Sequence, residues 1–117
     1  MATVFCDCGT VWLTQLMNAT VTVTGYFVGW GEGTGTAAKA NTSLFSEVQS
    51  RITAPSSISA FNQMQWISTI TATAVRSITN AGLFHNGSGT LLVKGDFSTL
   101  ALATNDRIEF TVTMTTT

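Results

Sequence analysis

The chain has 117 residues, of which only 9% are charged, and its net charge at neutral pH is −1. This length suits one domain with a sizeable core, the few scattered basic residues exclude a basic nucleic-acid-binding patch, and no apolar run is long enough to cross a membrane. Threonine and serine take the place of charged residues on the polar faces. Because charges keep free proteins soluble and are depleted in interface cores, this composition indicates either a threonine-rich β protein or a subunit packed in an assembly.

The first nineteen residues differ in pattern from the rest of the chain. Apolar residues spaced by three and four positions predict a short helix from about Thr10 to Met17 that ends at Asn18, although a bulged strand fits the same residues. The segment lacks the basic start and the long apolar region of a signal peptide, so we expect none. We therefore divide the chain into an N-terminal arm or short helix, residues 1–19, and a single β domain, residues 20–117.

Both cysteines lie in this N-terminal segment. Cys6 and Cys8 are separated by one residue, which predicts that they share one side of a strand, in poor geometry for a mutual disulfide. Two thiols are too few for a zinc site, and the single histidine, His85, is distant in the sequence. We expect free reduced thiols in a protein made in a cytoplasm, with an intermolecular metal or disulfide link between subunits as the alternative.

From Thr20 the apolar pattern changes to a period of two, which is typical of β-strands. The strand predicted over residues 20–30 is rich in β-branched and aromatic residues. Its second half, which includes Tyr26 and Val28, is apolar on both faces. We therefore expect a central strand, or one whose second face contacts another chain.

The next strands follow a loop around the single proline. Residues 61–75 alternate, with one apolar face and one mostly polar face. The following strand, residues 75–84, leads into Asn86-Gly87, a strong signal for a tight hairpin. Residues 90–97 then return antiparallel, and a period of two predicts that their large apolar side chains share one face, namely those of Leu91, Val93 and Phe97.

The last strand, residues 107–115, shows the cleanest alternation in the chain, after a turn at Asn105-Asp106. Its apolar residues are predicted to point inward and its charged residues and threonines outward. Five or six strands spaced in this way predict an all-β fold. We expect a single antiparallel β-sandwich, immunoglobulin-like or jelly-roll-like, with room for one short N-terminal helix.

The stretch "GWGEGTG" places glycines at four alternate positions from Gly29 to Gly35. Neither the dinucleotide-binding pattern nor the P-loop pattern matches these spacings, so a phosphate site is not expected. Glycines also allow a loop to lie close against another backbone, and Trp30 inside the run could anchor a neighbouring subunit, although core packing is the alternative for all three tryptophans. The interface residues predicted on this basis are Trp30, Gly31, Gly33, Gly35, Tyr26, Val28, Cys6 and Cys8.

Catalytic constellations are weak in this sequence. His85, Ser88 and Asp96 have the residue types of a nucleophilic triad, but the first two flank a hairpin tip that nothing shields from water. The carboxylates are scattered, and no pair has a spacing that predicts a shared acid–base site. We expect the arginines at 51, 76 and 107 to form ion pairs at subunit edges. The sequence thus predicts no enzyme, no cofactor and no metal site.

Three stretches of the chain resemble a group of small β-rich structural proteins of tailed bacteriophages. They are "VGWGEGTGTAAKANTSLFSEVQSR", "ITATAVRSITNAGLF" and "LLVKGDFSTLALATNDRIEFTVTM", which together span about three-quarters of the chain, residues 28–114. The motifs of that group are structural and not catalytic. The resemblance implies a virion component, made in the cytoplasm of the host bacterium. The first 25 residues match no part of the group and could form an attachment arm.

The resemblance and the low charge lead to one main expectation and two alternatives. The main expectation is a capsid decoration (cement) protein that forms a homotrimer. Its expected partners are the major capsid protein or other virion proteins, and it is expected to bind neither nucleic acid nor membrane. The first alternative is a tail, neck or fibre component that contacts a host receptor. The second is a carbohydrate-binding sandwich or an enzyme, which would need exposed aromatic residues beside carboxylates or a catalytic cluster.

Overall fold

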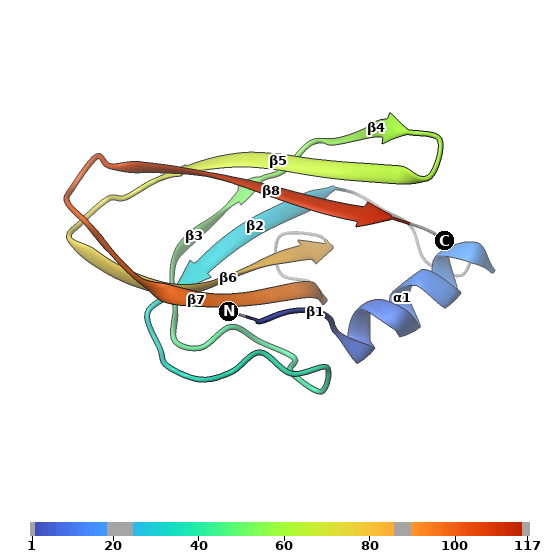
Figure 1. Cartoon of the computed structure of the whole chain (residues 1–117), viewed down its shortest axis with the longest axis horizontal. Helices are drawn as coiled ribbons and strands as arrows, with labels where there is room; N and C mark the ends of the chain where they lie inside the picture. Colours follow the sequence, from blue (N-terminus) through green and yellow to red (C-terminus); the bar gives the residue numbers. More distant parts are fainter. Residues whose placement is uncertain (1, 19–24, 86–89, 116–117) are drawn as a thin grey trace.

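The computed structural model describes residues 2–18, 25–85 and 90–115 of the chain, and these form one helix and eight strands (Figure 1). The all-β, sandwich-like fold predicted from the sequence is confirmed, with more strands than the five or six expected. In chain order the elements are β1 (Ala2–Phe5), α1 (Asp7–Met17), β2 (Tyr26–Gly31), β3 (Glu47–Thr53), β4 (Ser56–Ala60), β5 (Gln63–Thr71), β6 (Arg76–His85), β7 (Leu91–Leu102) and β8 (Arg107–Thr115).

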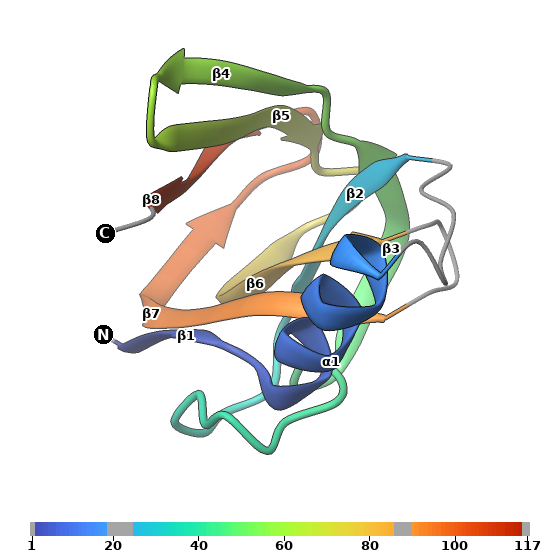
Figure 2. The same ribbon diagram turned by 90° about the vertical axis from the view of Figure 1, so that its right-hand side faces the viewer.

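The strands form two antiparallel sheets. The larger sheet has the order β1-β7-β6-β2-β3 and the smaller one the order β4-β5-β8. Figure 2 shows the two sheets as separate layers, with the glycine-rich segment beneath the five-stranded sheet, and Figure 1 shows α1 at one end of the molecule. The chain passes between the layers at the connections β3–β4, β5–β6 and β7–β8.

The smaller sheet follows the period of two predicted from the sequence. In β5, Trp66 and Ile70 are buried while Ile67 and Thr69 are exposed. β8 pairs with β5 along its whole length without any shift in register, from Arg107 opposite Thr71 to Thr115 opposite Gln63. The four apolar residues of β8 point toward the core, as predicted.

The core lies between the sheets and is built around the three tryptophans, all buried. Trp30 of β2 meets Phe110 of β8 edge to face, with ring centroids 6.3 Å apart. Trp66 of β5 meets Tyr26 of β2 in the same manner at 5.3 Å. Trp12 brings the helix onto this core. Since both sheets and the helix contribute to one cluster, the described residues form one packed unit.

The N-terminal segment belongs to this unit, so the predicted boundary after residue 19 is wrong. β1 pairs with β7, from Ala2 opposite Asp96 to Phe5 opposite Val93. The predicted short helix is confirmed, and it begins earlier than expected, at Asp7. The N–H of Cys6 donates to the carbonyl of Leu92 at 2.9 Å, which fixes the start of the helix on β7.

Irregularities in β7 change the predicted side-chain faces. Leu83 lies opposite Val93, but Phe84 lies opposite Leu91, so Leu92 is an extra residue in the ladder. As a result Leu91 packs on the outer face with Phe84, whereas Val93 packs in the core. The predicted shared face of Leu91, Val93 and Phe97 is therefore wrong.

The two predicted turns have different outcomes. The turn at Asn105-Asp106 is confirmed, with Asn105 in the left-handed region at a φ of 76°. The hairpin signal Asn86-Gly87 and the first part of the predicted 20–30 strand, residues 20–24, lie outside the described residues.

Candidate interaction surface

Two residues predicted to contact a partner lie in the protein's own core. Trp30 and Val28 are each only 1% exposed, on the face of β2 that looks toward the smaller sheet. The prediction that Trp30 anchors a neighbouring subunit is therefore wrong, and the core alternative is confirmed. β2 is a central strand, paired with β3 on one side and β6 on the other.

The glycine-rich segment packs closely against another backbone, as predicted, but that backbone belongs to the same chain. A Cβ atom at Gly31 would lie 2.3 Å from the carbonyl oxygen of Phe45. At Gly33 it would lie 2.8 Å from the carbonyl carbon of Phe45, and at Gly35 2.7 Å from its ring. The glycines thus let the segment 32–46 fold back beneath the five-stranded sheet, and their predicted role as an intersubunit contact is not needed to explain them.

Polar side chains from the sheet hold this returning segment. The side chain of Asn80 accepts a hydrogen bond from the Phe45 N–H at 3.0 Å and donates one to the Phe45 carbonyl at 3.1 Å. Nζ of Lys94 donates to the carbonyl of Ser43 at 2.8 Å and lies 3.2 Å from the centroid of the Phe45 ring. Lys94 is fully buried, and this desolvation lowers its pKa, although Cys6 and Asp96 oppose the shift.

The cysteines lie at the start of α1 and not on one side of a strand, so that expectation is wrong. Cys6 immediately precedes the helix and is fully buried, while Cys8 lies in its first turn and is half-buried. Within the described chain, neither cysteine forms a disulfide. Burial raises the pKa of Cys6, with Cys8 and Asp7 acting in the same direction and Lys94 against it. A buried thiol with a raised pKa is unreactive.

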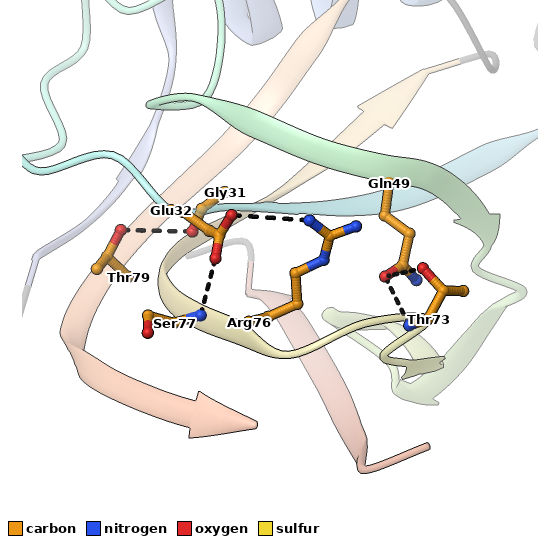
Figure 3. Close-up of polar contacts among 7 residues, drawn as sticks. All are labelled: Gly31, Glu32, Gln49, Thr73, Arg76, Ser77 and Thr79. Carbon is orange, nitrogen blue, oxygen red and sulfur yellow. Dashed lines mark hydrogen bonds and ion pairs between the residues drawn. The ribbon is translucent and has the colours of Figure 1, made fainter. Parts of the chain in front are cut away.

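Ion pairs predicted at subunit edges are formed inside the chain for two of the three arginines. Figure 3 shows Arg76 reaching Glu32 at 3.8 Å, while the same carboxylate accepts the Ser77 N–H at 2.8 Å. Arg51 pairs with Glu47 at 2.8 Å. The Arg76–Glu32 pair joins the start of the glycine-rich segment to β6, and the Arg51–Glu47 pair lies within β3. Both pairs therefore stabilise the fold of the single chain.

Gln49 of β3 makes a further set of polar contacts, which join the larger sheet to the smaller one. Its backbone φ is 69°, a conformation that costs energy for a residue with a side chain. The side-chain amide donates to the Thr71 carbonyl at 2.7 Å, and its oxygen accepts the N–H and the hydroxyl of Thr73, both at 3.1 Å (Figure 3). These bonds tie β3 to the β5–β6 connection.

The candidate triad is not assembled. Asp96 lies opposite Asn80, five residues along β6 from His85, which corresponds to about 17 Å along the strand. His85 is buried beside Trp12, with ring centroids 5.6 Å apart. Ser88 lies outside the described residues. Across the described ranges, no three His, Cys, Asp or Glu side chains gather as metal ligands would.

The candidate site is an apolar groove of about 310 Å³ between α1 and the β4–β5 hairpin, which we call the hairpin groove. Ile58 is 79% exposed and Phe61 is 99% exposed at its outer rim. Tyr26 lines the groove, half-buried, and burial raises the pKa of its hydroxyl. The groove is lined by Trp12, Leu16, Tyr26, Ile58, Phe61 and Met64, among others.

Of the residues that line this groove, only Tyr26 is among the interface residues predicted from the sequence. The sequence does contain a local sign of this site. The stretch "SSISAFNQ", just after Pro55, places two large apolar side chains, those of Ile58 and Phe61, among polar and small residues. An isolated exposed apolar residue is ordinary. Only the fold shows that Ile58 and Phe61 share one groove with the helix.

Comparisons with known proteins give no assignment. No family model, no curated protein and no solved structure matches this chain. In the part of the chain that the structure describes, no helix has the length and apolar character needed to span a membrane.

Proposed function

We propose that this protein is a structural component of a tailed-bacteriophage virion, made in the host cytoplasm, and that it acts as a capsid decoration (cement) protein. Two observations support the proposal. The first is the resemblance of its three segments within residues 28–114 to phage structural proteins. The second is a surface in which charges are scarce and apolar side chains are presented outward. We further propose a homotrimer whose partner is the major capsid protein.

The hairpin groove carries the proposal. Large apolar side chains exposed beside a concave apolar surface mark interaction sites, and buried aromatic anchors contribute much of the free energy of an interface. Fully burying one such side chain contributes about 1.5–3 kcal/mol. Phe61, which is 99% exposed at a hairpin turn, can enter a pocket of a partner without any change in its own fold.

The mechanism is mechanical. Each copy would bury the rim of its groove against the capsid and bridge neighbouring capsomers, which internal pressure tends to separate. A contact of standard size buries about 1,600 Å² in total. Many weak contacts in a symmetric shell add up, because a protein bound at one point is already at high local concentration for the next.

The first experiment measures the copy number of this chain against the major capsid protein in purified particles of the phage that encodes it, by quantitative mass spectrometry. A ratio near one copy per capsid subunit supports a decoration protein. A few to a few dozen copies per particle would replace that role by one in the tail, neck or fibre. Complete absence from particles would overturn the virion assignment.

A second experiment tests the groove itself. Particles that lack the protein are mixed with purified Phe61→Ser protein or with a Val75→Ser control, which alters an exposed apolar residue, 77% exposed, in the β5–β6 connection. We expect Phe61→Ser to lower binding by at least about tenfold and Val75→Ser to leave it unchanged. Equal binding by both variants would exclude the hairpin groove as the contact.

A further inference from the structure

The two sheets have four edge strands, and three of them carry features that discourage pairing with another chain. β1 has only four residues and β4 only five. β3 is irregular, with a register shift in its pairing with β2 and a left-handed residue at Gln49. Short edges and bulges are the usual means by which proteins prevent strand addition.

β8 lacks these features. It is nine residues long, pairs with β5 without a register shift and contains neither lysine nor proline. No described strand pairs with its other edge. Its only charged residues are Arg107 and Glu109 at one end, so Thr111–Thr115 form an uncharged exposed edge. A long regular edge strand of this kind offers a row of backbone donors and acceptors for another strand.

The side of the sandwich next to β8 is also incompletely closed. A cavity of about 250 Å³ lies between β8 and the inner face of the larger sheet, lined by Phe110, Val112, Val93 and Phe97 among others. A second, of about 450 Å³, continues along Thr113–Thr115 toward β1 and α1. Among the described residues, none with a charged side chain lines either cavity. The apolar side chains of β8 therefore remain half-exposed on the same side as its unpaired backbone.

We propose that the free edge of β8 pairs antiparallel with β8 of a second copy of this chain, about a two-fold axis that passes through Thr111. Such pairing would join two three-stranded sheets into one of six strands. Because the axis is perpendicular to the sheet, the inward faces of both strands stay on the same side. The half-exposed apolar residues of the two copies then meet across the junction.

The register follows from overlap and charge. A two-fold axis at Thr111 pairs all nine residues of β8, and it sets Glu109 opposite the Thr113 position and Arg107 opposite the Thr115 position. An axis at Glu109 would place two glutamates directly opposite each other, which is unfavourable. An axis at Thr113 would pair only the last five residues, 111–115. Thr111 thus gives the longest pairing without opposed like charges.

This inference does not depend on the proposed virion function. Pairing through β8 adds a two-fold contact between copies of the chain. It therefore predicts a dimer, or two rings joined to each other, whereas the resemblance suggests a single trimer. Failure of β8 pairing would leave the particle-binding experiments unaffected, and loss of particle binding would leave the dimer measurement unaffected. The two proposals can therefore fail separately.

The test uses opposite charges at the axis. We expect Thr111→Lys and Thr111→Glu each to weaken self-association by at least about tenfold, because like charges would face each other at close range. An equimolar mixture of the two variants should associate again, as measured by analytical ultracentrifugation. The matched control is Thr69→Lys on β5, which is exposed on the same face and lies opposite Glu109, on the side of β8 away from its free edge. Circular dichroism checks that each variant is folded.

Cross-linking fixes the register. In a Cys8→Ser background, Thr111→Cys should form a disulfide-linked dimer under mild oxidation, whereas Glu109→Cys and Thr113→Cys should do so only when mixed with each other. A monomeric wild-type protein at all accessible concentrations, or no rescue by the charge-swapped mixture, would overturn the proposal. Protection of β8 amides only inside the particle would also overturn it, and would assign the edge to another protein.

Discussion

The two outer surfaces of this sandwich differ in how far the chain itself covers them. Beneath the five-stranded sheet, the chain covers itself with the segment 32–46, held by Asn80 and Lys94. At the three-stranded sheet nothing in the described chain covers the β4–β5 hairpin or the edge of β8. The comparison teaches that glycines and buried polar side chains mark the face that the protein closes, while exposed apolar residues mark the face that the described chain leaves open.

The difference lies in how many side chains of each face pack against the chain itself. On the covered face, side chains such as Asn80 hydrogen-bond to the returning segment. On the open face, Ile58 and Phe61 of the hairpin point into solvent, and one edge of β8 has no described partner strand. Substitutions on the covered face should therefore act on the free energy of unfolding, and those on the open face on association.

The largest expected effect is at Trp30. Trp30→Ala would remove a fully buried ring that packs against Phe110, and we expect it to lower the free energy of unfolding by about 3–5 kcal/mol. Urea unfolding followed by circular dichroism measures this loss. If the variant were as stable as the parent protein, Trp30 would be free to serve a partner after all.

A smaller loss is expected where the segment 32–46 meets the sheet. Gly31→Ala would place a methyl group against the Phe45 carbonyl, only 2.3 Å away, so the segment must shift. Such overpacking costs about 1–3 kcal/mol. Thr34→Ala, at an exposed position of the same segment, should stay within about 0.5 kcal/mol of the parent. Equal effects of the two substitutions on the urea midpoint would argue against close packing at Gly31.

The buried amine of Lys94 predicts a pH dependence. Its pKa is lowered in the folded protein from the usual 10.5, so between the two values the unfolded chain holds more protons than the folded one. Stability then rises with pH across that window, by at most about 1.4 kcal/mol per pH unit. Cys6, whose pKa is raised above 9.0 against the effect of Lys94, gives the opposite trend, so both proteins in the comparison below carry Cys6→Ala.

The comparison sets the parent protein against Lys94→Met over a pH series below 10.5. The stability difference, parent minus variant, should increase as pH rises through the lowered pKa of Lys94. A difference that stays flat, or that decreases toward alkaline pH, would show that the amine is not desolvated in the folded state.

Much of the fold could be predicted from the sequence because strand periodicity is a local property. The alternation in β8 is visible in its residues alone, and the turn at Asn105 follows from the same stretch. The helix was predicted from its spacing, and only its start was misplaced. The bulge at Leu92 was missed because a period of two assumes a regular ladder.

The candidate site was harder to predict because it depends on which surface is left uncovered. An apolar residue such as Trp30 can face the core or a partner with the same local sequence. The burial of Trp30 is decided by β8, which lies almost eighty residues later in the chain. Likewise, the exposure of Phe61 follows from the absence of any described segment over the hairpin.

The smallest expected effect on stability is at the rim of the hairpin groove. Ile58→Ser and Phe61→Ser change side chains that are 79% and 99% exposed, so little apolar burial is lost on substitution. We expect the free energy of unfolding of each to stay within about 0.5 kcal/mol of the parent. A large loss in urea unfolding would mean that the rim packs against the protein's own chain in solution. The hairpin would then belong with the covered face, and the contrast between the two surfaces would disappear.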